Sequence, residues 1–305
     1  MVSSPVSSFA VENLPSWVET LFQGDVDCLE TEKNLDFAEI RFCRRKLNGL
    51  ALHTYTVDNT TTLLWNELRT VVNHIYSSTA KYYSSKQNYF PTRYWNFIPR
   101  INDVLHEELT TYYVFNMGRY EAMLRSSGCK DGTCQTSTAV GCPGNNLSVS
   151  CLFGSTPPRH LENPAQIPAY HYSKAYGPLP PCFSRATLAS ILGQDILLVG
   201  GTSSVRGEVS VHPGDYPAQM TETLNNLASL VESAWHKTQE GPLQGKPLEK
   251  FEHVTAYVVN PAHIETTRNK LIDVMPNVSS VQIMQSNICR PELMVEIEGS
   301  VNMSS

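Results

Sequence analysis

The sequence predicts an α+β protein of two domains, whose C-terminal half packs helices on one face of a mixed sheet. Its 305 residues exceed the length of an average single domain. In the last third, strand-like and helical patterns alternate, and two strand-like segments then follow each other. We expect an N-terminal α+β domain over residues 1–150 and a C-terminal domain over residues 151–305.

The first half begins with strands and continues with helices. Residues 41–57 are strand-like on both sides of Asn48-Gly49, a dipeptide typical of tight hairpins. Residues 63–83 carry apolar side chains at helical spacing, so we expect a helix there. Two more helical segments, a cysteine-bearing loop and a strand are expected at 103–116, 117–127, 127–147 and 146–154.

Residues 156–190 are rich in proline and tyrosine. Proline lacks a backbone donor and restricts the residue before it, so we expect little regular structure here. The segment is nevertheless too aromatic for a disordered linker. We expect a bent segment that packs on the surface and lines a cleft.

The C-terminal third predicts the order strand, helix, strand, helix, strand, strand. Asp215 is a candidate N-cap for the first helix, and Pro261 fits the first turn of the second. The expected strands are at 195–204, 250–260, 280–288 and 293–301, and the expected helices are at 215–237 and 261–275. This succession places the helices on one face of the sheet.

Composition excludes several classes of partner. The formal net charge of −6 does not attract nucleic acid or an anionic membrane. No apolar run approaches the roughly 20 residues of a membrane span, and the N-terminus lacks the regions of a secretory signal. We therefore expect a cytoplasmic protein with reduced thiols. The spacings of Cys129, Cys134, Cys142 and Cys151 match no common zinc pattern, so we expect no metal site.

Residues 293–298 form a strand-like segment with acids on one face. Because strand side chains alternate, Met294, Glu296 and Glu298 share a face, opposite the apolar residues. One interpretation is an edge strand whose outer face is solvated. The other is a general acid held on a rigid strand.

Three further residues are candidate ligands for a small molecule. Arg119 and Arg185 suit a dicarboxylate, because the planar guanidinium binds a carboxylate with two hydrogen bonds. Structural salt bridges explain each arginine equally well. Gly201 ends a strand, and its lack of a side chain lets the backbone and a ligand approach closely.

A set of short sequence motifs, in this order along the chain, resembles the chorismatase family, bacterial enzymes that split chorismate into pyruvate and a ring product. The matching motifs lie at 93–102, 113–122, 162–172, 176–186, 200–215, 218–227 and 288–299. The resemblance implies a RidA/YjgF-like fold for the C-terminal half and an N-terminal domain of similar build. It places the site in the cleft between them, and it implies no metal or organic cofactor.

The resemblance also implies roles for individual residues. Glu296 occupies the position of the family's catalytic glutamate, and Cys289 that of a cysteine found only in the branch that makes 3-hydroxybenzoate. Arg119 matches the arginine that grips a substrate carboxylate. The other residues that we expect to contact substrate are Arg185, Tyr170, Tyr176, Gly201, Ser203 and Arg206.

Several positions depart from the family pattern. Ser203 replaces a glycine or alanine, and Leu179 replaces an arginine. Arg206 and Glu208 lie in a motif that differs from the usual family motif, and Arg206 is a candidate replacement for the basic group lost at Leu179. Ser203 is a candidate ligand for the water that a hydrolytic reaction needs.

The function implied is the cleavage of chorismate to pyruvate and 3-hydroxybenzoate, by a monomer or a homotrimer. We expect a Cys289 thiolate as the base that removes the ring proton, with its pKa lowered by Arg290 or Arg119. The alternatives are hydrolysis of chorismate to a dihydroxycyclohexadiene carboxylate, a RidA-like enamine/imine deaminase, and a ligand-binding module. In a further alternative for Cys289, the thiol only fills the base of the pocket.

Overall fold

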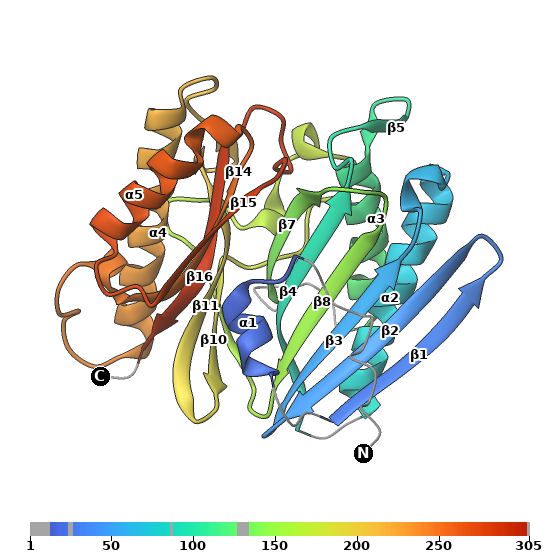
Figure 1. Cartoon of the computed structure of the whole chain (residues 1–305), viewed down its shortest axis with the longest axis horizontal. Coiled ribbons are helices and arrows are strands. Elements are labelled where there is room, and N and C mark those ends of the chain that lie inside the picture. The colour runs from blue at the N-terminus through green and yellow to red at the C-terminus, as the bar shows by residue number, and fades with distance from the viewer. Residues whose placement is uncertain (1–12, 24–26, 86–87, 127–133, 304–305) are drawn as a thin grey trace, which may run out of the picture.

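The computed structural model describes residues 13–23, 27–85, 88–126 and 134–303, and it contains two six-stranded sheets (Figure 1). The first sheet has the strand order β1-β2-β3-β8-β4-β7. Its strands are β1 (Asp27–Leu35), β2 (Ala38–Leu47), β3 (Leu50–Val57), β4 (Phe90–Pro99), β7 (Thr136–Cys142) and β8 (Leu147–Gly154). Helices α2 (Trp65–Ser85) and α3 (Thr111–Ser126) cover its outer face.

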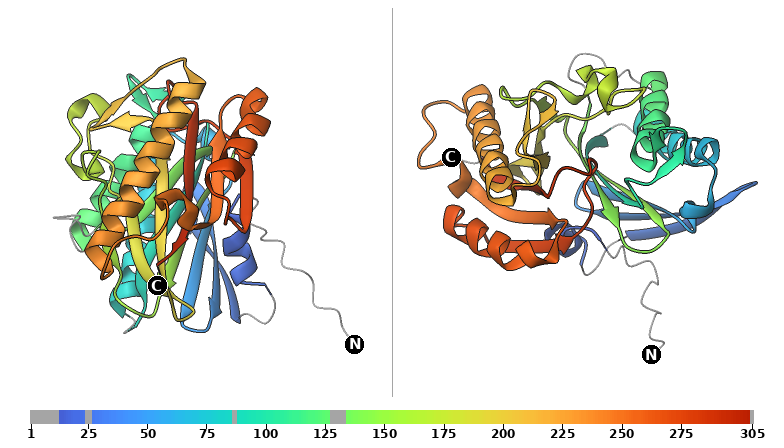
Figure 2. Two further views of the ribbon diagram at one scale, coloured as in Figure 1. Left: turned by 90° about the vertical axis from the view of Figure 1, so that its left-hand side faces the viewer. Right: turned by 90° about the horizontal axis from the view of Figure 1, so that it is seen from above.

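The second sheet has the strand order β15-β14-β16-β11-β10-β9. Its strands are β9 (Arg159–Leu161), β10 (Ala186–Ile191), β11 (Gln194–Ser203), β14 (Phe251–Val258), β15 (Ser280–Gln285) and β16 (Val295–Asn302). The β14–β15 pair is parallel and the other pairs are antiparallel, so this sheet is mixed. Helices α4 (Tyr216–Thr238) and α5 (Ile264–Val274) lie together on its outer face (Figure 2).

The α+β prediction is confirmed, and most elements lie where the sequence placed them. Asn48 and Gly49 form the β2–β3 turn with φ angles of 45° and 80°, which these two residue types tolerate. Asp215 caps α4, because its Oδ1 accepts a hydrogen bond of 3.0 Å from the amide of Ala218. Residues 156–185 hold little regular structure apart from short elements, as expected, but residues from Ala186 onward form β10, which was not predicted.

Two segments of the first half differ from the prediction. The two helices expected over residues 103–127 are replaced by a short hairpin of β5 (Val104–His106) and β6 (Leu109–Thr110) and one helix, α3 (Thr111–Ser126). Glu107 adopts a φ of 50° in the hairpin turn, which no helix allows. Strand β4 was not predicted, because it is buried on both faces from Thr92 onward and shows no alternation of polar and apolar residues.

One expectation about cysteines is also corrected. Cys134 is disulfide-bonded, so the prediction of reduced thiols is wrong at this position. Cys142, Cys151, Cys182 and Cys289 are free thiols, as expected. Among the helices in the described ranges, none is long and apolar enough to cross a membrane.

The inner faces of the two sheets pack against each other. Trp95 of the first sheet and Leu198 and Tyr257 of the second belong to one buried apolar cluster, which the short helix α1 (Ser16–Leu21) joins through Val18. Two further clusters lie between each sheet and its helices. Burial of apolar surface between the sheets therefore holds the halves together.

Backbone contacts also join the sheets, around β7 and β11. The amide of Gly141 in β7 donates to the carbonyl of Asn287 at 2.7 Å, and Thr136 forms a bridge with Ser184. A Cβ at Gly200 in β11 would approach Thr136 to 2.9 Å, so only glycine fits this contact. The strands that carry the candidate residues therefore meet at this boundary.

Candidate active site

A pocket at the boundary of the two halves gathers most of the residues singled out in the sequence. Its walls come from α3, β7, the proline- and tyrosine-rich segment, β11 and the chain leading into β16. The lining residues are Tyr112, Tyr113, Ser137, Ala139, Tyr172, Tyr176, Pro181, Phe183, Arg185, Gly201, Ser203, Val205, Cys289, Arg290, Leu293 and Glu296.

Glu296 lies on a central strand rather than on an edge. Strand β16 runs between β14 and β11, and Glu296 is 5% exposed. The interpretation of a solvated edge strand is therefore wrong. The carboxyl of Glu296 packs against Gly201, where any Cβ would overlap Oε1. The pairing of β11 with β16 is irregular between Val199 and Thr202, and this irregularity brings the glycine backbone beside the acid.

The environment of Glu296 favours its protonated form. Burial raises the pKa of Glu296 to about 8, and the charge of Glu298 adds to the effect. The hydrogen bond from Ser203 and the guanidinium groups of Arg185 and Arg93 act in the opposite direction but do not outweigh burial. Glu296 therefore carries a proton at neutral pH, as a general acid requires.

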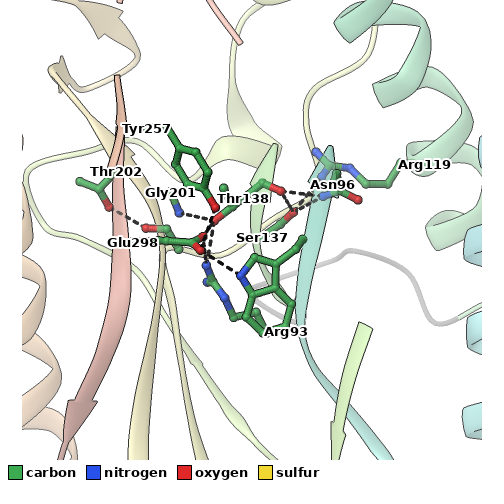
Figure 3. Close-up of polar contacts among 11 residues, drawn as sticks. Arg93, Asn96, Arg119, Ser137, Thr138, Gly201, Thr202, Tyr257 and Glu298 are labelled. Carbon is green, nitrogen blue, oxygen red and sulfur yellow. Dashed lines mark hydrogen bonds and ion pairs between the residues drawn. The ribbon is translucent and has the colours of Figure 1, made fainter. Parts of the chain in front are cut away.

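Glu298 lies beyond the pocket, at the centre of a polar network that spans both sheets (Figure 3). Its Oε2 accepts from Arg93 Nη2 at 2.5 Å and from the Thr138 hydroxyl. Its Oε1 accepts from Trp95 Nε1 and from the Tyr257 hydroxyl, both at 3.0 Å. Neither residue of the Arg93–Glu298 pair is more than 1% exposed.

Arg185 contributes positive charge to the pocket wall. Its Nη2 donates to the Tyr172 hydroxyl at 2.5 Å, and its guanidinium lies over the ring of Phe183. Its buried Nε has no hydrogen-bond partner. No carboxylate in the described part of the chain forms an ion pair with Arg185, so the structural salt bridge considered from the sequence is not found there.

Arg119 lies one side chain behind the pocket wall. Its Nη1 donates to Ser137 Oγ at 3.3 Å, and its Nη2 donates to Asn116 Oδ1 at 2.7 Å. Ser137 lines the pocket, whereas Arg119 does not. Arg119 is 1% exposed, its Nε lacks a partner, and no ion pair to it occurs within the described ranges. A buried guanidinium without a counterion is costly, so an anion nearby would stabilise it.

Arg290 is a third cation at the pocket, and the sequence assigned it no direct contact with a ligand. Its guanidinium lies 3.8 Å from the centre of the Tyr176 ring. Its Nη1 donates to the Glu208 carbonyl at 2.8 Å and to Ser210 Oγ at 3.0 Å. Its position directly after Cys289 could have identified it as a pocket residue from the sequence.

The structure corrects the expected state of Cys289. The residue lines the pocket beside Glu296, as expected. Burial, followed by the charge of Glu296, raises the pKa of its thiol to about 12, and Arg290 does not reverse the shift. Cys289 is therefore a neutral thiol near pH 7, and the expected thiolate base is not supported.

Besides Arg119, two other predicted ligand residues do not line the pocket. Tyr170 is not among the lining residues and packs against the apolar cluster between the first sheet and its helices. The side chain of Arg206 is 63% exposed and binds Glu222 through Nε and Nη2 at 2.8 and 2.7 Å. Arg206 therefore does not replace the basic group absent at Leu179.

Several lining residues were missed from the sequence. Tyr112 lies in the first turn of α3, whose bounds were predicted wrongly, and Ser137 and Ala139 share the inward face of β7, which the sequence placed in a loop. Recognising β7 as a strand would have identified both. Within the described part of the chain, no group of three or more His, Cys, Asp or Glu side chains is arranged to hold a metal ion.

Comparisons with known proteins agree on one family. Residues 43–153 match the family model described as "Chorismatase FkbO/Hyg5-like, N-terminal". A chorismatase of Streptomyces rapamycinicus is 34% identical over 212 residues, which make up 68% of this chain and 63% of that protein. A 3-hydroxybenzoate synthase of Streptomyces hygroscopicus is 32% identical over 216 residues, which make up 68% of this chain and 62% of that protein.

A crystal structure of a chorismatase shares the fold. It matches 91% of this chain and 89% of its own, with a TM-score of 0.75 and 22% sequence identity. The aligned part of the chain spans slightly less than two thirds of the length of the two curated relatives.

Proposed function

Because the chain belongs to the chorismatase family, we propose that it cleaves the enolpyruvyl ether of chorismate and releases pyruvate without a cofactor. The observation that carries this proposal is the buried carboxyl of Glu296, whose pKa is raised to about 8, in a pocket bordered by cationic groups. An enol ether is cleaved by protonating its terminal methylene, which needs an acid that keeps its proton near neutral pH.

The cations suit the two carboxylates of chorismate. Arg185 and Arg290 line the pocket, and Arg119 lies directly behind Ser137. Arg185 and Arg119 each retain an Nε donor without a partner. Binding of a dianion would supply the missing counterions, and a charge-assisted hydrogen bond contributes about 1.5–3 kcal/mol.

In the proposed reaction, Glu296 transfers its proton to the methylene carbon and becomes a carboxylate. The enolpyruvyl group becomes an oxocarbenium ion, and the bond between the ring and its oxygen breaks as pyruvate leaves. For 3-hydroxybenzoate, the adjacent ring hydroxyl closes an epoxide-like intermediate, which opens and loses a ring proton. No water is consumed, so the atoms of chorismate equal those of the two products.

We assign the removal of the ring proton to Glu296 rather than to Cys289. After the first step Glu296 is a carboxylate in the same pocket, and taking up the ring proton regenerates the acid. Cys289 keeps its own proton, because its pKa is raised to about 12. The neutral thiol fills space beside Glu296 and excludes water from it, which favours the intramolecular route.

Hydrolysis is the second candidate, and Ser203 favours it. Its hydroxyl lines the pocket and lies 3.3 Å from Oε2 of Glu296. A hydroxyl at this place can also bind a water, and addition of that water to the oxocarbenium ion would yield pyruvate and a dihydroxycyclohexadiene carboxylate. We favour 3-hydroxybenzoate because Cys289 occupies the pocket beside the acid.

The experiment is incubation of the purified protein with chorismate in D₂O containing EDTA, with pyruvate trapped as lactate by a coupled dehydrogenase. We expect lactate whose methyl group carries one deuterium, since the carboxyl proton of Glu296 exchanges with solvent between turnovers. Chromatography identifies the ring product. Absence of pyruvate above the uncatalysed rate would overturn the proposal, and would leave a deaminase or a binding module. Loss of activity with EDTA, restored by a divalent metal, would overturn the cofactor-free scheme.

A further inference from the structure

Glu298 is a second buried carboxylate on the strand that carries Glu296. Residues two apart share a strand face and lie about 6.5–7 Å from each other. Glu298 is 1% exposed and does not line the pocket, so it does not contact a bound substrate. No step of the proposed reaction uses it.

Every partner of Glu298 is a donor, as an ionised carboxylate requires. Arg93 and Trp95 come from β4, Thr138 from β7 and Tyr257 from β14, so the donors belong to both sheets (Figure 3). Glu298 therefore connects the strand of the acid to the opposite half of the molecule.

Thr138 extends this network to the wall of the pocket. Its hydroxyl donates to Glu298 and accepts from Arg93 Nη2 at 2.8 Å and from the amide of Gly201 at 3.0 Å. Gly201 is the residue against which the Glu296 carboxyl packs. One continuous chain of hydrogen bonds thus runs from Glu298 to the backbone that supports the acid.

We propose that Glu298 is the positioning residue of the site: it docks the acid's strand onto the first sheet and fixes a negative charge on the same face as Glu296. This inference rests on the proposed function of Glu296 as the acid. The consequence is that Glu296 stays protonated and correctly placed, although Glu298 never touches the substrate. The charge of Glu298 is in fact the second cause of the raised pKa of Glu296, after burial.

Other groups near Glu296 set the background against which Glu298 acts. The neighbours that influence the pKa of Glu296, or whose own pKa reflects the charge of Glu296, come from α3, β4, β11, β14, β16, the segment before β10 and the chain before β16. They are Tyr112, Arg93, Ser203, Tyr257, Glu298, Arg185 and Cys289. Arg93 is the only one of these seven that pairs directly with Glu298 through opposite charge.

This pairing gives a test by the sign of a shift. Glu298→Gln removes the negative charge and leaves Arg93, so the pH at which kcat/KM falls as Glu296 ionises should move down by about one unit. Arg93→Gln leaves Glu298 without its counterion, so this upper limb of the kcat/KM profile, where activity falls as Glu296 ionises, should move to higher pH. Glu252→Gln, on β14 beside Asn302, is the matched control and should leave the limb in place.

A purely structural role predicts a different result. It would lower kcat and the melting temperature in both variants without opposite displacements of the limb. Equal or absent displacements in two folded variants would therefore overturn the proposal. Should Glu298→Gln fail to fold, Thr138→Val removes only the hydroxyl that links Glu298 to Gly201. It should lower kcat at least tenfold with little change in KM, and unchanged kcat would count against the positioning role.

A measurement without substrate separates this inference from the proposed function. Infrared titration of the protonated carboxyl band, assigned by its loss in Glu296→Gln, reports the ionisation of Glu296 directly. We expect the band to titrate at lower pH in Glu298→Gln and at higher pH in Arg93→Gln. If the band shifts as expected but chorismate is not cleaved, the proposed function fails and the electrostatic role of Glu298 stands. If the band does not shift, the role of Glu298 fails.

Discussion

The hydroxyl of Ser203 donates a hydrogen bond of 3.3 Å to Oε2 of Glu296, and the two residues are directly paired across β11 and β16. The bond stabilises the ionised form and lowers the pKa of Glu296 against the dominant effect of burial. Ser203 therefore adjusts the proton affinity of Glu296.

Replacing Ser203 tests this adjustment. Ser203→Ala removes the donor, so the pKa of Glu296 should rise further and the upper limb of the kcat/KM profile should move to higher pH. We expect a displacement of less than about one unit, the size of one ordinary hydrogen bond. Ser204→Ala is the control, since that hydroxyl donates to Val211 instead. A limb that stays in place would show that Ser203 does not bond the acid in solution.

Glu296→Gln tests the acid itself. The amide keeps the shape of the side chain and removes the proton that the reaction needs, so kcat should fall about 10²–10⁴-fold. Pyruvate release measured at a fixed pH gives the ratio, and Glu252→Gln is again the control. A variant that retains most of its activity would assign the acid to another residue.

Relative to the wild type, Glu296→Gln should become more stable as the pH rises. The pKa of Glu296 is raised from its ordinary value of 4.5 to about 8 in the folded protein. The stability due to this group is complete below pH 4.5 and is lost progressively up to about pH 8, because folding then keeps a proton that the unfolded chain releases. Glu296→Gln avoids this loss. Its melting temperature minus that of the wild type should grow between these pH values, and a constant difference would contradict the raised pKa.

Arg119 should affect substrate affinity more than turnover. Arg119→Ala removes a buried cation beside Ser137, so KM for chorismate should rise about 10–100-fold, the equivalent of one charge-assisted hydrogen bond. Arg119→Lys keeps the charge without the planar fork and should recover part of the affinity. Arg159→Ala, at an exposed arginine, is the control. An unchanged KM in folded Arg119→Ala would make Arg119 a structural residue.

Strands β11, β14, β15 and β16 of the second half could be predicted because each shows a distinct apolar pattern bounded by glycine, proline or a cap, whereas β9 and β10 were not predicted. The acid on β16 was found for the same reason, since its alternation is plain in residues 293–298. Strand β4 is buried on both faces and has no period to detect. Arg93 therefore could not be recognised as a partner of Glu298, because their sequence separation of 205 residues closes only in the fold.

Charge states were harder to predict than positions. Arg290 follows Cys289 directly and Arg119 was expected at the same site, which favoured a thiolate, but the fold buries the thiol next to another acid. Burial then outweighs the arginine, because desolvation disfavours the charged form of a fully enclosed group. Arg206 was expected in the pocket because it lies close to Ser203 in sequence. Its side chain instead extends to the surface and pairs with Glu222.

The neutral thiol of Cys289 leads to a prediction about the ring product. If its role is to occupy space beside Glu296 and exclude water, Cys289→Ala should leave pyruvate release within a few-fold of the wild type. Part of the ring product should change from 3-hydroxybenzoate to the dihydroxycyclohexadiene carboxylate, because the smaller side chain admits water. Chromatography of the products measures the ratio, and Cys142→Ala, outside the pocket, is the control. The raised pKa also predicts slow alkylation of Cys289 by iodoacetamide at pH 8 in the native protein. Rapid alkylation, together with loss of pyruvate release in Cys289→Ala, would restore the thiolate as a catalytic base.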